Sequence, residues 1–168
     1  MTDSQIIKTL ALIPGLFVLD RAHREATQEI LREHYKLPED FTCIAENVLA
    51  EQFVAMTDGS ILKVSMESGE MEAISGSLCQ LQAALTTHED ANYLLANSLA
   101  RDWEACNKKK LTKDFRLLPI QPFIAGGAFE ASNVYAEKRK VAINYLFELY
   151  AQIKDLPDGA TIALKVVP

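Results

Sequence analysis

The stretch QFVAMTDGSILKVSMESGEMEAIS, residues 52–75, decides the fold of this 168-residue chain. Asp58-Gly59 separates two apolar runs and is typical of a type I′ turn, so we expect the runs to pair as a β-hairpin. A second turn at 67–70 leads into a third strand at 71–75. Strands joined by such short turns must be antiparallel, because a parallel pair needs a crossover of about a dozen residues or more. Ile61-Leu62 interrupts the alternation of apolar residues, so the pattern leaves the buried face of this meander open.

Helical patterns lie on both sides of the strand meander. Apolar residues recur there at helical spacing, and capping residues precede several runs, such as Ser77 with Gln80 three residues later. Residues 41–50 fit a helix or a strand equally well. Helices are predicted at about 3–11, 21–35, 78–85, 87–106 and 140–154, and further strands at 117–123, 132–136 and 161–167. The sequence therefore predicts a single domain, 1–168, of the α+β class, with an antiparallel β-sheet meander packed against several α-helices.

The composition predicts a well-filled core and an acidic surface. Hydrophobic residues make up 49% of the chain and charged residues 24%, close to the averages for globular proteins. Seventeen Lys and Arg against 23 Asp and Glu give a net charge of −6, which argues against a generally nucleic-acid-binding surface. The longest uncharged apolar stretch, 9–19, is interrupted by Pro14 and is too short to span a bilayer, so we expect no membrane partner. No secretory pattern opens the chain and the three cysteines lack metal-ligand spacing, which predicts reduced thiols and a cytoplasmic protein.

The negative charge is concentrated in one segment. Between residues 37 and 90 the chain has ten acidic residues and a single basic one, Lys63. The acids are Glu39, Asp40, Glu46, Glu51, Asp58, Glu67, Glu70, Glu72, Glu89 and Asp90. Residues 101–168 contain instead eleven bases and eight acids. Such polarity can steer association with a basic partner, although acids on strands and turns also serve solubility alone.

The sequence has no pattern to which we assign catalysis or metal binding. None of the three histidines is spaced from another, or from a cysteine, as metal ligands usually are. No catalytic serine or cysteine signature is present, and Glu70 with Glu72 is interpreted as two acids on a solvated strand face. The lysines at 108–110 lack the interleaved aromatic residues of a single-strand nucleic-acid platform. We therefore expect no catalytic residues, no metal, no cofactor and no nucleic-acid partner, and a binding protein becomes the leading class.

The C-terminal third carries short motifs in a recognisable order. Residues 122–127, PFIAGG, are followed by Ser132-Asn133-Val134 and by a helix that ends in a Leu-Pro-x-Gly turn at 156–159. With the strand meander upstream, this order resembles the C-terminal domain of type VI secretion DNase-immunity proteins, in the SUKH-like immunity superfamily. The resemblance covers about residues 50–167, and the helical N-terminal part, 1–40, matches less well.

The resemblance implies a non-catalytic immunity protein that binds and neutralises a cognate protein toxin. A nuclease is the candidate class of toxin, because a nuclease must hold phosphates in a positive groove and an acidic surface suits such a groove. We expect the acids of the meander to face the toxin. The predicted partner-binding residues are Asp58, Glu67, Glu70 and Glu72.

The motif residues are expected to shape the backbone rather than to contact the partner. Gly126, Gly127, Pro157 and Gly159 are assigned to turns, because glycine adopts positive φ and proline fixes its own φ. Asn133 is expected to make a local hydrogen bond from its side chain to the backbone.

An alternative reading remains open at this point. The chain could be a small-molecule-binding or regulatory interaction domain with an unidentified ligand. A deep cleft lined by His23, His34 or Cys43 would favour it, since small-molecule sites are concave with a few convergent polar groups. The sequence also leaves the oligomeric state open.

Overall fold

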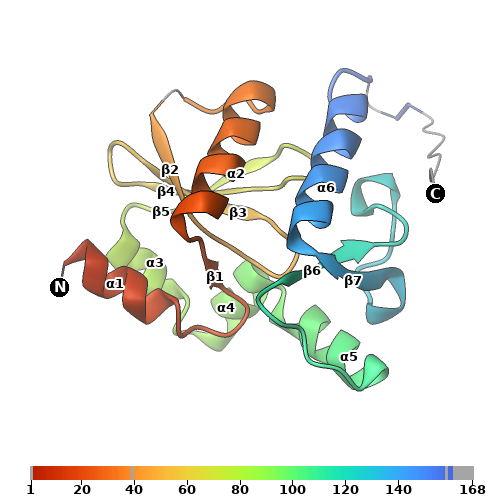
Figure 1. Cartoon of the computed structure of the whole chain (residues 1–168), viewed down its shortest axis with the longest axis horizontal. Coiled ribbons are helices and arrows are strands. Elements are labelled where there is room, and N and C mark those ends of the chain that lie inside the picture. Colours follow the sequence, from red (N-terminus) through yellow and green to blue (C-terminus); the bar gives the residue numbers. More distant parts are fainter. Residues whose placement is uncertain (1, 39, 158, 161–168) are drawn as a thin grey trace.

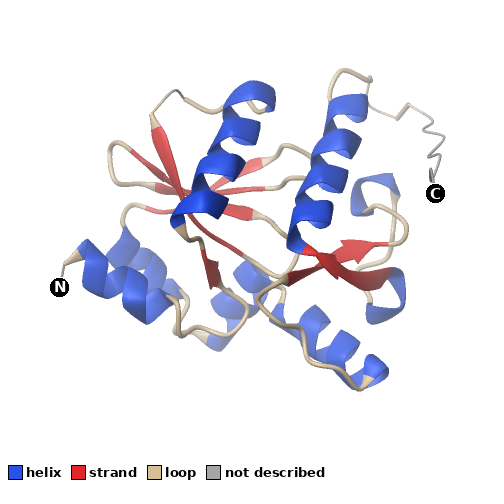
Figure 2. Ribbon diagram, viewed as in Figure 1, coloured by secondary structure: helices blue, strands red, loops and turns tan. Residues whose placement is uncertain are grey.

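A five-stranded antiparallel sheet forms the centre of the structure, with helices on both of its faces (Figure 1, Figure 2). The computed structural model describes residues 2–38, 40–157 and 159–160. In chain order the elements are α1 (Asp3–Leu10), β1 (Phe17–Val18), α2 (Arg21–His34), β2 (Phe41–Glu46), β3 (Gln52–Met56), β4 (Ile61–Val64), β5 (Met71–Ser75), α3 (Leu78–Ala84), α4 (His88–Leu95), α5 (Asn97–Asn107), β6 (Phe115–Pro119), the 3-10 turns η1 (Phe123–Ala125) and η2 (Ala131–Asn133), β7 (Val134–Lys138) and α6 (Arg139–Ile153). The predicted α+β class, with an antiparallel meander packed against helices, is confirmed.

The strands lie across the sheet in the order β1-β2-β3-β4-β5, each antiparallel to its neighbour. The last three are the predicted meander. β2 lies in the stretch 41–50, where the pattern fitted a helix or a strand. All its residues except Thr42 are buried, because helices cover both faces of the sheet. A strand covered on both faces loses the polar–apolar alternation that would have identified it.

The two faces of the sheet belong to two core clusters. On one face α2 and α6 pack against the strands, with Val54 and Leu146 among the buried residues. On the other face α1, α3 and α4 pack, with Phe53 and Leu81 among the buried residues. Phe53 and Val54 are neighbours in β3 and point into opposite clusters, as consecutive strand residues must.

Because helices cover both faces of the sheet, the adjacent residues Ile61 and Leu62 of β4 can both be apolar. The pairing of β4 with β5 shifts register between these two residues. Ile61 joins the cluster on the α3 side, while Val64 joins the cluster on the α6 side. The extra residue of this bulge is Ile74 on β5, because Ile61 pairs with Ser75 and Leu62 pairs with Ala73, so β4 itself keeps its alternation between the two faces.

The β3–β4 turn forms where it is predicted, but the predicted turn type is wrong. Gly59 has a φ of 89°, whereas Asp58 is not in the left-handed region, and a type I′ turn needs positive φ at both central residues. Gly59 N donates to Met56 O at 3.0 Å, and Met56 N donates to Ser60 O at 2.8 Å. This is the pattern of a three-residue hairpin loop with glycine at the bulge position. The Asp58 carboxylate accepts from Ser60 N at 2.9 Å and holds the turn.

The single helix predicted for 87–106 is two helices in the structure. Ala96 has a φ of 53°, which ends α4 and starts α5 in a new direction. Across this break, Ser98 N donates to the Asn92 side-chain oxygen at 2.7 Å. The buried residues of α4 belong to the core cluster that contains Phe53 and Leu81, whereas those of α5 belong to a third cluster. Packing against two separate cores therefore favours the break, although the helical pattern runs through it.

β6 and β7 form a second, two-stranded antiparallel sheet. They overlap the strands predicted at 117–123 and 132–136, but β6 begins two residues and ends four residues earlier than predicted, and β7 begins and ends two residues later. Trp103 of α5 shares the third core cluster with Leu117 of β6. The backbone N–H of Leu117 donates to a carbonyl oxygen in the loop after β2 at 2.7 Å, which ties the two sheets together. The strand predicted at 161–167 lies outside the described residues.

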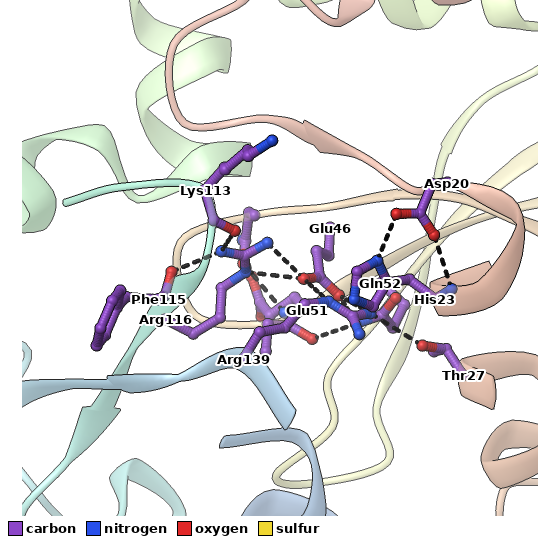
Figure 3. A network of polar contacts seen from close by, with 12 residues as sticks. Asp20, His23, Thr27, Glu46, Glu51, Gln52, Lys113, Phe115, Arg116 and Arg139 are labelled. Atoms are coloured by element: carbon purple, nitrogen blue, oxygen red, sulfur yellow. Dashed lines mark hydrogen bonds and ion pairs between the residues drawn. The ribbon is translucent and has the colours of Figure 1, made fainter. Parts of the chain in front are cut away.

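A buried carboxylate joins the central sheet to the second sheet, α2 and α6 (Figure 3). Glu46, at the end of β2, is fully buried, and Arg116 of β6 and Arg139 of α6 both reach it. Arg116 Nε lies 2.8 Å from Glu46 Oε1, and Arg139 Nη2 lies 2.7 Å from Oε2. Gln52 Nε2 donates to Oε2 at 3.0 Å. Arg139 Nη2 also donates to Thr27 Oγ1 of α2 at 3.0 Å.

The two guanidinium groups keep this carboxylate ionised. Burial raises the pKa of Glu46, but the charges and hydrogen bonds of Arg116 and Arg139 outweigh burial and hold the pKa below its usual value. Without the carboxylate, two buried cations would face each other with no counter-charge, which is the costly way to break a buried ion pair.

Replacing Glu46 by Ala is expected to lower the free energy of unfolding by about 3–5 kcal/mol, the usual cost of leaving buried charges unpaired. The matched control is Glu25→Ala, which removes an ion pair with Arg21 on the exposed surface of α2. That change is expected to cost less than about 1 kcal/mol, because water already screens the exposed pair. Urea denaturation followed by circular dichroism measures both variants. Equal losses in the two would contradict a structural role for Glu46.

Candidate functional site

The acids predicted to bind a partner lie in two separate places. Asp58 is exposed at the β3–β4 turn, whereas Glu70 is exposed at the β4–β5 turn and Glu72 follows it in β5. The four residues of β4 separate the two turns, a distance of roughly 13 Å along the strand. Glu70 and Glu72 can therefore contact one partner surface together, and Asp58 belongs to the other end of the sheet.

Glu67 is not available to a partner, which corrects the prediction for this residue. It is 8% exposed, and its Oε1 accepts from Ile124 N at 2.7 Å. Burial raises the pKa of Glu67, while hydrogen bonds from the backbone N–H groups of Ile124 and Phe123 act in the opposite direction. Its carboxylate therefore joins the β4–β5 turn to η1 instead of facing solvent.

Glu72 and Glu51 meet at one lysine, Lys63. Lys63 and Glu72 are paired directly across β4 and β5, and Lys63 Nζ lies 3.2 Å from Glu72 Oε2. Glu51, at the start of β3, lies 3.8 Å from the same ammonium group. Glu70 is near enough for its charge to act on Glu51. Two carboxylates thus lie within ion-pair distance of Lys63, and a third, that of Glu70, acts on one of them.

Exposed aromatic residues lie beside these charges. The Tyr93 hydroxyl donates to Glu72 Oε2 at 3.1 Å, and its ring centroid lies 4.6 Å from Lys63 Nζ. Tyr93 is 64% exposed and Phe129 is 56% exposed. Both line a pocket of about 460 Å³, which we call the acidic groove. Its defining residues are Glu51, Lys63, Glu89, Tyr93 and Phe129, with Glu72 in contact with two of them.

The acidic groove is short of positive charge. Burial raises the pKa of Glu51, and the charges of Glu72 and Glu70 raise it further. Lys63 and a hydrogen bond from Asn47 Nδ2, at 2.6 Å, only partly offset these effects. A carboxylate in this state gains from an additional cation placed near it.

The Gly-Gly motif and Asn133 form a backbone turn next to Phe129, and none of these three motif residues lines the acidic groove itself. A Cβ added to Gly127 would lie 1.9 Å from Gln121 O, so no larger residue fits there. Asn133 Oδ1 accepts from Gln121 N at 2.9 Å, and its Nδ2 donates to Gln121 O and to Ala128 O, both at 2.9 Å. Gly126 has a φ of 81° and ends η1.

The second motif turn follows α6. Pro157 O accepts from Ala160 N at 3.1 Å. Gly159 adopts a φ of 79°, which glycine reaches without strain. Neither residue lines the acidic groove.

Within the described residues, no three His, Cys, Asp or Glu side chains are grouped as a metal ion would require. Cys43 is buried, and burial raises the pKa of its thiol to about 12. Cys79 and Cys106 are exposed and lie on different helices, α3 and α5. No described helix is both long enough and apolar enough to cross a membrane.

Sequence reasoning missed Glu51, Tyr93 and Phe129 as members of the site. The available signal was Lys63, the single base among ten acids, since the hairpin register places it opposite Glu72. Neither the models of known protein families nor the curated proteins match this chain.

Replacing Lys63 by Met is expected to make stability fall more steeply as pH rises above the ordinary pKa of a glutamate, about 4.3. Glu51 has a raised pKa in the folded chain, so the folded state binds this proton more tightly than the unfolded state. The stabilisation that comes from binding this proton is present at low pH, and it is lost as the pH rises to the pKa of Glu51 in the folded chain. Without Lys63 that pKa rises further and the loss extends to higher pH. Urea denaturation across this range measures the slope.

Adding Glu51→Gln to the Lys63→Met variant provides the control. Glutamine cannot titrate, so the extra pH dependence should disappear in the double variant. A slope in Lys63→Met equal to that of the unmodified chain would show that Lys63 and Glu51 are not coupled.

Proposed function

We propose that this chain is a non-catalytic immunity protein that binds and neutralises a cognate bacterial protein toxin of the nuclease type. The acidic groove would be its binding surface, and the cytoplasm of the toxin-producing cell its place of action. The observation that carries the proposal is the grouping of Glu51, Glu70 and Glu72 beside exposed Tyr93. The resemblance of the sequence motifs to DNase-immunity proteins supports the same function.

The chemistry of a nuclease explains why this surface suits it. A nuclease holds its substrate by the phosphates and therefore presents Lys and Arg in its cleft. Carboxylates at the edge of a complementary surface accelerate encounter and fix orientation. Tyr93 and Phe129 supply the aromatic contact area that usually provides most of the affinity.

Glu51 has a specific part in this proposal. Its raised pKa reflects a position that is partly buried and insufficiently neutralised. A lysine or arginine of the toxin that enters the acidic groove would supply the missing charge and lower that pKa. Binding would then release a proton and become tighter as pH rises through the pKa of Glu51 in the free protein.

The double variant Glu70→Lys/Glu72→Lys is expected to slow association with the toxin at least about tenfold in low salt, because charge steering is lost and reversed. The partner to be tested is the product of the neighbouring gene, which this proposal expects to contain a nuclease domain. Stopped-flow association rates across a salt series measure the effect, and growth rescue on co-expression measures neutralisation. The salt dependence of the rate should also weaken in this variant.

The matched control is Asp58→Lys, which reverses an acid at the opposite end of β4. At about 0.15 M salt it is expected to change the association rate less than about twofold, because the Debye length of about 8 Å is then shorter than the separation of the two turns. Tyr93→Ala should raise the dissociation rate while leaving association nearly unchanged. The acidic groove is the wrong surface if Asp58→Lys slows association as much as the double variant does.

A further inference from the structure

A second pocket, of about 730 Å³, lies where the segment before α2 meets the starts of β6 and α6. A volume in this range is ordinary for a small-molecule site. We call it the basic pocket, after Lys113, Lys138 and Lys140, which are exposed around it. Its lining includes His23, and it shares no lining residue with the acidic groove.

Basic side chains outnumber acidic ones around the basic pocket. In addition to the three lysines, Arg116 and Arg139 contribute to its wall and are largely buried (Figure 3). The acidic lining residues are Asp20 and Asp114. Behind the wall, one carboxylate, Glu46, is shared between the two guanidinium groups. The pocket therefore keeps an excess of positive charge on an otherwise acidic chain.

The carboxylate of Asp20 is already engaged within its own helix turn. Its Oδ1 accepts from His23 N at 2.9 Å, and its Oδ2 lies 2.8 Å from His23 Nδ1. It caps α2 and holds the imidazole ring at the pocket wall (Figure 3). Its negative charge is thus directed to His23 and to the start of α2, and not to the lysines.

The start of α6 adds to the positive potential of the basic pocket. Arg139 and Lys140 begin this 15-residue helix, and Lys138 precedes it with no side-chain cap. The first turn contains no acidic residue. Cations at the positive end of a helix dipole are unfavourable by themselves, whereas an anion bound among them is attracted both by the cations and by the dipole.

The remaining lining is apolar and aromatic. Phe17 and Phe115 both contribute, and the Arg116 guanidinium carbon lies 3.8 Å from the centroid of the Phe17 ring. Such a wall accommodates a flat organic group next to the cations that hold phosphate oxygens. We propose that the basic pocket binds a small, phosphate-bearing organic anion of about nucleotide size. The site is separate from the proposed toxin-binding surface and does not depend on it.

Calorimetric titration of the full chain with ADP, and separately with inorganic pyrophosphate, tests this proposal. ADP is expected to bind with a Kd below about 1 mM, and pyrophosphate more weakly, because it lacks the group that contacts the apolar wall. The variant Lys113→Gln/Lys140→Gln should weaken ADP binding at least about tenfold. These two side chains make no ion pair or side-chain hydrogen bond with the rest of the described chain, so we expect the variant to fold normally, as its urea midpoint will show.

The control variant is Lys109→Gln/Lys154→Gln, which makes the same change in net charge at exposed lysines outside the basic pocket. Its ADP affinity should stay within about twofold of the unmodified chain. Absence of saturable ADP binding, or equal losses in the two double variants, would overturn the proposed site. Pyrophosphate binding as tight as ADP would overturn the assignment to a ligand of nucleotide size.

Discussion

The buried carboxylate of Glu46 is the constraint on which the arrangement of the elements depends. An ionised group can remain in the interior only if its charge and its hydrogen-bonding capacity are both satisfied there. Its partners come from three other elements, since Gln52 belongs to β3, Arg116 to β6 and Arg139 to α6, and Arg139 in turn binds Thr27 of α2. The interaction is therefore complete only when all of these elements are in place. The same two arginines form the wall of the basic pocket, so the pocket is a product of this packing.

Local signals in the sequence were sufficient for much of the fold. Turn residues and caps act on their neighbours, so the meander and most helices are predicted within a few residues. These local signals are not sufficient where packing against distant parts of the chain determines the secondary structure. Residues 41–46 form a strand without alternation because both faces are covered, and Ala96 breaks a continuous helical pattern between two cores. Nothing in the sequence pairs Glu46 with Arg116 and Arg139, which lie 70 and 93 residues away.

The candidate site was predictable as a region but not as a set of residues. The count of charges locates the acidic segment, since charge is a property of composition. It cannot tell which carboxylates face solvent. Glu67 turns inward to a backbone N–H of η1, and Asp58 lies beyond the far end of β4. Glu51 acquires its role only because the register of the strands brings Lys63 between it and Glu72.

The order of strands in the central sheet has a consequence for how copies of the chain meet. In the part of the chain that the structure describes, β1 and β5 are the two outer strands, and an outer strand offers backbone groups to any other chain that can pair with it. β1 is only two residues long, which gives a second chain little to pair with. β5 is longer, but Glu72 within it and Glu70 just before it place negative charge along that edge. Two copies approaching through β5 repel each other, so the charges proposed to attract a basic toxin also protect the protein against aggregation through its own sheet.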